Sequence, residues 1–128
     1  MSYYFSKTVE MSFDEAVGRV TEELKKEGFG ILTDIDVKET LKKKLNVDFR
    51  KYRILGACNP PFAHKALQAE DKIGLMLPCN VVVEETADRK IEVAAIDPVA
   101  SMQAIENPRL REVAEQVRDK LKRVINNL

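Results

Sequence analysis

Hydrophobic and polar residues alternate at the start of the chain with the period of a strand and then recur with the period of a helix. A half-buried strand ending near Met11 is predicted by the alternation of Tyr3, Phe5, Lys7 and Val9 with Tyr4, Ser6, Thr8 and Glu10. A helix is predicted directly afterwards, because Ser12 and Glu15 form a capping box and Gly28 suits a left-handed helix end. Its apolar stripe comprises Phe13, Ala16, Val17, Val20 and Leu24.

The middle of the chain predicts shorter elements. A strand is expected at Gly30–Ile35, followed by a short helix that opens at Asp36 and runs to about Leu45. Tyr52–Cys58 has the composition of a buried strand, and Asn59-Pro60-Pro61 must end it because proline supplies no ladder donor. A short helix over Pro61–Ala69 follows.

The pattern then predicts a hairpin and a final helix. Ile73–Leu77 and Val81–Val83 are interpreted as one long strand interrupted at Pro78, which implies a bulge or a sheet edge there. A partner strand is expected at Lys90–Ile96 and a helical turn after Asp97-Pro98, with Asp97 a helix cap in preference to a pocket acid. Asn107-Pro108 opens the last helix, whose apolar stripe comprises Leu110, Val113, Val117, Leu121, Val124 and Leu128.

These elements add up to one α+β domain spanning residues 1–128, since no linker, low-complexity tract or repeat divides the chain. The expected fold is a mainly antiparallel sheet with the long N- and C-terminal helices packed on one face. The opposite face of the sheet, or one of its edge strands, would then be exposed to solvent unless another surface packs against it. A homodimer is the commonest way to supply one, and we expect it here.

Composition narrows the classes of partner. The 128 residues are 45% hydrophobic, enough for one substantial core, and 21 basic residues balance 21 acidic ones. With a net charge of zero, binding to nucleic acid or to an anionic membrane is disfavoured. We expect no membrane span and no signal peptide, and therefore a cytoplasmic protein in which any Cys58–Cys79 disulfide is transient.

Two cysteines mark the candidate site. Each stands where a strand-like apolar run meets a proline and an asparagine, in Gly56-Ala57-Cys58-Asn59-Pro60-Pro61 and in Leu77-Pro78-Cys79-Asn80. A thiol just before a helix N-terminus would meet exposed amides and a partial positive charge, which favour a reactive thiolate at Cys58. Gly56 would permit a close approach, and Asn59 would cap the helix or donate to a bound group. The expected ligand-binding residues are Cys58, Asn59, Pro60, Pro78, Cys79 and Asn80.

Two other interpretations of the cysteines stay open. Both could be small buried core residues, because free cysteine is among the most buried residue types. A metal site of Cys58, Cys79 and His64 is the sharper alternative, with His64 the single histidine of the chain. It is disfavoured because helical spacing places His64 with Lys65 and Gln68, away from the apolar face of Phe62, Ala63, Ala66 and Leu67.

Three segments in order carry a resemblance to a known family. They are Tyr52-Arg53-Ile54-Leu55-Gly56-Ala57-Cys58-Asn59-Pro60, then Ile73-Gly74-Leu75-Met76-Leu77-Pro78-Cys79, then Asp97-Pro98 before Met102. Together they resemble the domain-of-unknown-function family numbered three hundred and two, over about Gly28 to Met102. The resemblance implies a β-α-β-β-β-β-α arrangement similar to the TATA-binding-protein-like fold and is compatible with a dimer. It implies no activity, because none is established for the family.

Three functions follow as hypotheses. The first is a small-ligand-binding module, for a sulfur species or a soft metal among others, whose site surrounds the two cysteines. The second is a thiol redox enzyme in which Cys58 attacks and Cys79 resolves the product as a disulfide. The third is an interaction scaffold with two buried cysteines. The first is favoured because a catalytic thiol usually needs a positioned base and the only histidine points elsewhere. The sequence names no cofactor and leaves open whether the protein is an enzyme.

Overall fold

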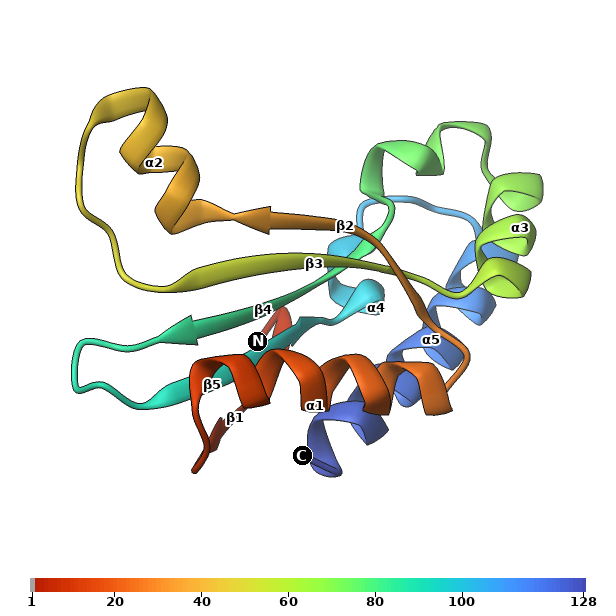
Figure 1. Ribbon diagram of the computed structural model, residues 1–128. Coiled ribbons are helices and arrows are strands. Elements are labelled where there is room, and N and C mark those ends of the chain that lie inside the picture. Colours follow the sequence, from red (N-terminus) through yellow and green to blue (C-terminus); the bar gives the residue numbers. More distant parts are fainter. Residues whose placement is uncertain (1) are drawn as a thin grey trace.

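The structure is a computed structural model that describes residues 2–128 (Figure 1). Its secondary structure alternates between strands and helices along the chain. The elements are β1 (Tyr4–Val9), α1 (Phe13–Lys26), β2 (Gly30–Asp36), α2 (Val37–Leu45), β3 (Tyr52–Cys58), α3 (Pro60–Ala69), the 3-10 helix η1 (Asp71–Met76), β4 (Cys79–Glu85), β5 (Ile91–Ile96), α4 (Pro98–Ser101) and α5 (Pro108–Asn126).

The five strands form one sheet in the order β1-β5-β4-β3-β2, and every neighbouring pair is antiparallel. The α+β class and the β-α-β-β-β-β-α order of the main elements are confirmed. Four shorter helical segments lie between these main elements: α2, α3 and η1 between strands, and α4 between β5 and α5. Of these, α2 projects beyond one end of the sheet, and α3 with η1 lies beyond the other (Figure 1).

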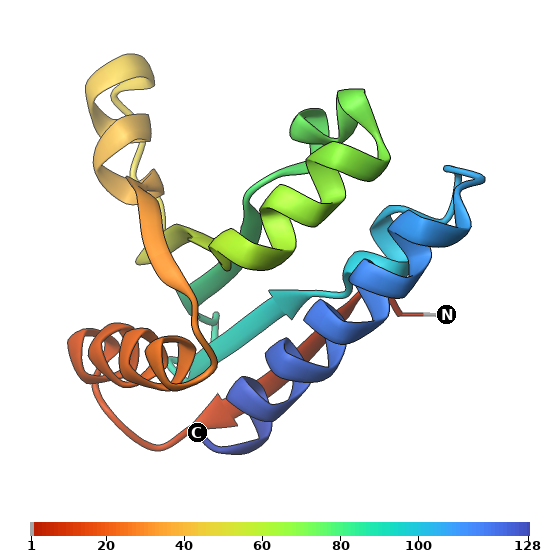
Figure 2. The ribbon, with the colours of Figure 1, turned by 90° about the vertical axis from the view of Figure 1, so that its right-hand side faces the viewer.

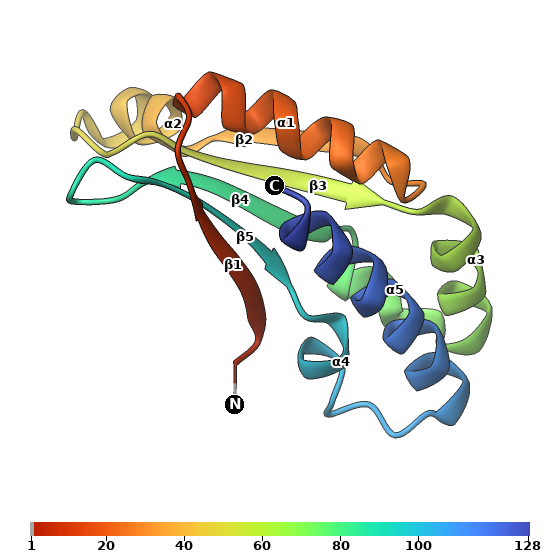
Figure 3. The same ribbon diagram turned by 90° about the horizontal axis from the view of Figure 1, so that it is seen from below.

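Helices α1 and α5 pack side by side against the same face of the sheet, as predicted (Figure 3). The capping box at the start of α1 is present: the Ser12 hydroxyl accepts from the Glu15 amide at 3.1 Å, and the Glu15 carboxylate accepts from the Ser12 amide at 3.4 Å. Alternate residues of β3, β4 and β5 face these helices, so the main core lies between the sheet and the helix pair. Its fully buried members include Val20, Leu24, Leu55, Val81, Val83, Val93, Leu121 and Val124.

A second, smaller hydrophobic cluster lies beyond the end of the sheet. It is formed by α3, η1, the turn after α4 and the first turns of α5, where Figure 2 shows α3 and α5 extending past the strands. Its buried members are Ala66, Ile73, Met102, Leu110 and Ala114. No helix among residues 2–128 is both long and apolar enough to span a membrane.

The predicted strand at Ile73–Leu77 is wrong. Asp71–Met76 forms the 3-10 helix η1, in which Ile73 is fully buried whereas Leu75 is 87% exposed. Pro78 follows a cis peptide bond and precedes the first residue of β4, so it makes neither a bulge nor an edge, and β4 is an inner strand. A short apolar run has no periodicity long enough to separate a buried strand from a buried turn of helix.

Gly56 stands where two elements approach β3 closely. A Cβ atom at this position would meet the Thr33 side chain and would lie 2.7 Å from Cγ of Pro78. Proline cannot turn its ring away, so we expect Gly56→Ala to lower the free energy of unfolding by about 1–3 kcal/mol through overpacking. Denaturation in urea, followed by circular dichroism, measures the change.

Gly18 provides the matched control for this prediction. It lies within α1, and a Cβ atom there would meet nothing within 4 Å. Gly18→Ala should therefore raise the free energy of unfolding by about 0.5–1 kcal/mol, because alanine loses less backbone entropy in a helix. Equal effects of the two substitutions would show that the crowding at Gly56 has no energetic weight.

Candidate functional site

The candidate site is a cavity of about 310 Å³ where the two hydrophobic clusters meet. The ends of β3 and β4 form its floor, and α3 and α5 form its walls. Its lining is almost wholly apolar. Among the large hydrophobic residues of the lining, Leu32 and Leu67 are the most exposed, at 67% and 46%. The lining comprises Phe29, Leu32, Ala57, Cys58, Asn59, Phe62, Ala63, Ala66, Leu67, Gly74, Leu77, Pro78, Cys79, Pro98, Met102, Leu110, Val113, Ala114 and Val117.

The structure brings Cys58 and Cys79 to this one cavity. In the β3–β4 register Ala57 pairs with Cys79, so Cys58 stands one residue beyond the pair, at the last position of β3. Both cysteines are free; Cys58 is half-buried and Cys79 is buried. Neighbouring strands were required for the two-cysteine site, and the pairing supplies them.

The environment of Cys79 keeps its sulfur protonated. Burial disfavours the charged thiolate, and the nearby Cys58 adds to this, so the pKa of the Cys79 thiol rises from 9.0 to about 11. At neutral pH Cys79 is therefore a neutral, polarisable part of an apolar wall and a poor nucleophile.

Asn59 does not cap α3, contrary to expectation. It occupies the N-cap position without a side-chain cap hydrogen bond, and its Nδ2 donates to the carbonyl of Glu27 at 3.0 Å. Gly28, with a φ of +88°, brings this C-terminal turn of α1 close to the Asn59 side chain. Asn59 is 7% exposed, so its first role is to fix the β3–α3 junction to the end of α1.

The other expected ligand-binding residues divide into two groups. Pro78 lines the cavity beside Cys79. Pro60 is exposed and takes no part in the lining, because it forms the first turn of α3. Asn80 is exposed on the uncovered face of the sheet, opposite Gly56, because side chains alternate along β4.

His64 lies on the exposed side of α3 with Lys65 and Gln68, as the helical spacing predicted. Within the described part of the chain, residues 2–128, no three His, Cys, Asp or Glu side chains are grouped as metal ligands. The three residues named for a metal site, Cys58, Cys79 and His64, are therefore not brought together.

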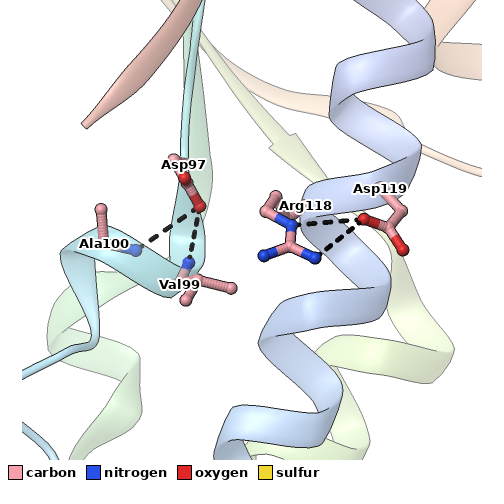
Figure 4. A network of polar contacts seen from close by, with 5 residues as sticks. All are labelled: Asp97, Val99, Ala100, Arg118 and Asp119. Carbon is pink, nitrogen blue, oxygen red and sulfur yellow. Dashed lines mark hydrogen bonds and ion pairs between the residues drawn. The ribbon is translucent and has the colours of Figure 1, made fainter. Parts of the chain in front are cut away.

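Asp97 is a helix cap. Its carboxylate accepts from the amides of Val99 at 3.0 Å and Ala100 at 3.5 Å, and so holds the first turn of α4 (Figure 4). The ion pair of Arg118 with Asp119 in the same view joins neighbouring residues of α5, at 3.2 Å. Asp97 therefore has a structural role, and neither acid of this view lines the cavity.

The hydrophobic pattern does not predict the α5 side of the cavity. This side is formed by three residues of the predicted apolar stripe, Leu110, Val113 and Val117, together with Ala114. The length of α5 is the signal that could have revealed this side. At about 1.5 Å per residue its 19 residues are longer than the neighbouring strands, which have 6 or 7 residues at about 3.3 Å each, so the first turns of α5 extend beyond the sheet.

Comparison with known proteins gives one consistent result. A crystal structure of an uncharacterized conserved protein DUF302 from Bacillus stearothermophilus superposes with a TM-score of 0.91 at 28% sequence identity, covering 98% of this chain and 98% of that chain. None of the curated proteins compared with the sequence matches it. The model of the family described as domain of unknown function DUF302 matches residues 5–128. The chain therefore belongs to this family of domains of unknown function.

Proposed function

We propose that the protein binds a small, predominantly apolar molecule in the cavity between α3 and α5, with the two cysteines in its wall. The observation that carries the proposal is the cavity itself: about 310 Å³ of space that opens to solvent on one side and is lined by apolar side chains. Ligand pockets in proteins begin at about 300 Å³ and are mostly apolar with few polar groups.

The lining also limits the chemistry of the ligand. Its polar groups are the two thiols and the carboxamide of Asn59, which already donates to Glu27. No ionisable side chain other than the thiols lines the cavity, so a charged group placed deep inside would be desolvated without a partner. If each heavy atom takes about the 30 Å³ of a water molecule in the liquid, the ligand has on the order of ten heavy atoms.

The redox alternative is less well supported. A resolving cysteine must act as a thiolate, and burial raises the pKa of Cys79 to about 11, which leaves little thiolate at neutral pH. Treatment with hydrogen peroxide followed by mass spectrometry separates the two functions. A Cys58–Cys79 disulfide that forms at substoichiometric oxidant and is reversed by dithiothreitol would favour the redox enzyme.

Naphthalene tests the binding proposal, because it is apolar, uncharged and has ten carbon atoms. We expect its fluorescence to report saturable binding to the wild type. Ala63→Phe should weaken this binding at least tenfold, since Ala63 lines the cavity from α3 and a phenyl ring there would occupy the space. Fluorescence titration with naphthalene gives both affinities.

Gln68→Phe is the matched control. Gln68 lies on the same helix but is exposed and outside the lining, so the same aromatic side chain should leave naphthalene binding unchanged. Thermal unfolding of both variants establishes that each is folded. Equal binding by the Ala63 and Gln68 variants, or no binding by the wild type, would contradict the proposal.

The homodimer stays part of the proposal. The face of the sheet turned away from α1 and α5 carries a row of directly paired apolar residues, Ile35, Ile54, Val82 and Ala94, one on each of four neighbouring strands. Ile35 is 46% exposed, and the other three are half-buried. A second copy related by a two-fold axis would cover this row with its own equivalent.

Sedimentation velocity tests the dimer. We expect the wild type to sediment as a dimer, and Val82→Lys, at the centre of the row, to produce a folded monomer because a lysine would be buried against its copy. Leu75→Lys changes a residue that is 87% exposed on η1 and should leave the dimer intact. A monomeric wild type would refute this part. The cytoplasmic location stays a prediction.

A further inference from the structure

We propose that the ligand is an amphipathic carboxylate, a medium-chain acid whose apolar tail fills the cavity while its carboxylate meets Lys65 and Lys120 beside Phe62. This inference rests on the proposed function, because it specifies the ligand of the same cavity. It starts from a separate observation: two lysine side chains lie beside Phe62, just outside the cavity lining.

Phe62 links the cavity to that charge. Its side chain lines the cavity from the first turn of α3. The ammonium group of Lys65 lies 5.4 Å from the centroid of the Phe62 ring, and that of Lys120, on α5, lies 5.8 Å from it. The two lysines come from the two helices that form the walls, and both ammonium groups lie beside the same ring.

The positive charges beside Phe62 are only partly balanced by protein carboxylates. Lys65 belongs to no ion pair among residues 2–128. Lys120 instead lies beside the carboxylate of Glu27, which is 3.8 Å from Lys120 and 3.0 Å from Arg123. The hydrogen bond from Arg123 holds the pKa of Glu27 below its usual range, so this carboxylate is already ionised and engaged. Among residues 2–128, Lys65 therefore has no carboxylate partner and Lys120 shares one with Arg123, so one further anion is accommodated beside the two lysines.

The apolar cavity and the lysines beside it therefore favour a ligand with an uncharged chain and an anionic group at one end. The cavity lining offers no partner for a charge, so a charged group must lie outside it, beside Phe62, whereas an uncharged chain can lie inside. Space for on the order of ten heavy atoms suits a chain of about eight carbons with a carboxylate. A cationic amphiphile would place like charge beside Lys65 and Lys120 and is disfavoured.

Competition with bound naphthalene distinguishes head-group chemistry from apolar binding. Octanoate, octan-1-ol and octylammonium have the same tail and differ in charge. We expect octanoate to displace naphthalene at about a fivefold lower concentration than octan-1-ol, as partly exposed ion pairs allow, and octylammonium to require more than octan-1-ol. Raising the salt concentration should reduce the difference between octanoate and octan-1-ol.

The double variant Lys65→Gln/Lys120→Gln should bind octanoate and octan-1-ol with equal affinity while retaining naphthalene binding. Lys122→Gln is the control, because Lys122 lies on α5 beside Phe5, which does not line the cavity. An equal affinity of the wild type for the acid and the alcohol, or a preference that survives in the double variant, overturns this inference and leaves apolar binding standing. Absence of naphthalene binding in the wild type overturns both.

Discussion

Leu24→Ala should lower the free energy of unfolding by about 3 kcal/mol, within the range of 2–5 kcal/mol typical of buried leucine truncation. Leu24 is 0% exposed and ends the apolar stripe of α1 where this helix packs on the sheet beside α5. Removing its side chain leaves a void in the main core, which the neighbouring helices and strands fill only in part. Urea denaturation followed by far-ultraviolet circular dichroism measures the change, with an unaltered slope against urea concentration.

Leu75→Ala is the matched control. It removes the same atoms from η1, where the side chain is 87% exposed, and should change the free energy of unfolding by less than about 0.5 kcal/mol. A loss at Leu75 as large as that at Leu24 would mean that η1 is covered in solution, and would contradict the placement of the core between the sheet and the two long helices.

The second large effect is expected at alkaline pH. Cys79 is 8% exposed, and burial raises the pKa of its thiol from 9.0 to about 11. Below pH 9 the thiol is protonated in both the folded and the unfolded chain. As the pH rises from 9 to 11, the unfolded chain releases this proton while the folded chain keeps it, so the free energy of unfolding falls. With about 1.4 kcal/mol per pKa unit, the loss reaches about 3 kcal/mol.

Cys79→Ala isolates this contribution, because the other groups that titrate in this range are present in both proteins. Unfolding in urea at a series of pH values from 8 to 11.5 should show the wild type losing up to about 3 kcal/mol relative to the variant. Cys58→Ser should keep most of the wild-type dependence, because burial, the larger cause of the raised pKa of Cys79, is unchanged. Parallel curves for the wild type and Cys79→Ala would show that Cys79 is accessible to water, and would remove the argument that its sulfur is neutral in the cavity wall.

Local patterns were sufficient for most of the elements. The capping box of Ser12 and Glu15 places the start of α1, because two side chains satisfy its first amides without help from the rest of the fold. Asn59-Pro60-Pro61 ends β3 and opens α3 for an equally local reason, the missing proline amides. The cap at Asp97 and the start of the last helix at Asn107-Pro108 were predicted correctly on the same basis.

The errors arose where a long-range contact outweighs a local preference. Asn59 has the side chain of a helix cap but donates to Glu27, which is 32 residues away in the sequence. Ile73–Leu77 is apolar enough for a strand, yet Ile73 joins the second cluster with Leu110 and Ala114, and the segment turns as η1. Neither the hydrogen bond of Asn59 nor the helical turn at η1 could be inferred without knowing which distant segments pack against them.

The candidate site shows the same division. The two cysteine segments were identifiable because prolines and asparagines interrupt apolar runs there, and four of the six residues named from them line the cavity: Cys58, Asn59, Pro78 and Cys79. The cavity itself depends on α5, whose first turns close it from the far end of the chain. The spacing along one chain gives no measure of the gap between two packed helices.

The sequence by itself determined the order of the main strands and helices, the capped helix ends, the covered face of the sheet and the positions of the two cysteines. These depend on periodicity and on contacts within a few residues, which a chain carries locally. Only the tertiary structure decided that both thiols line one cavity, that Asn59 donates a hydrogen bond to the end of α1, and that Lys65 and Lys120 lie beside Phe62. Such features are set by the packing of segments distant in sequence, where the volume left between side chains and the burial of each charge first become defined.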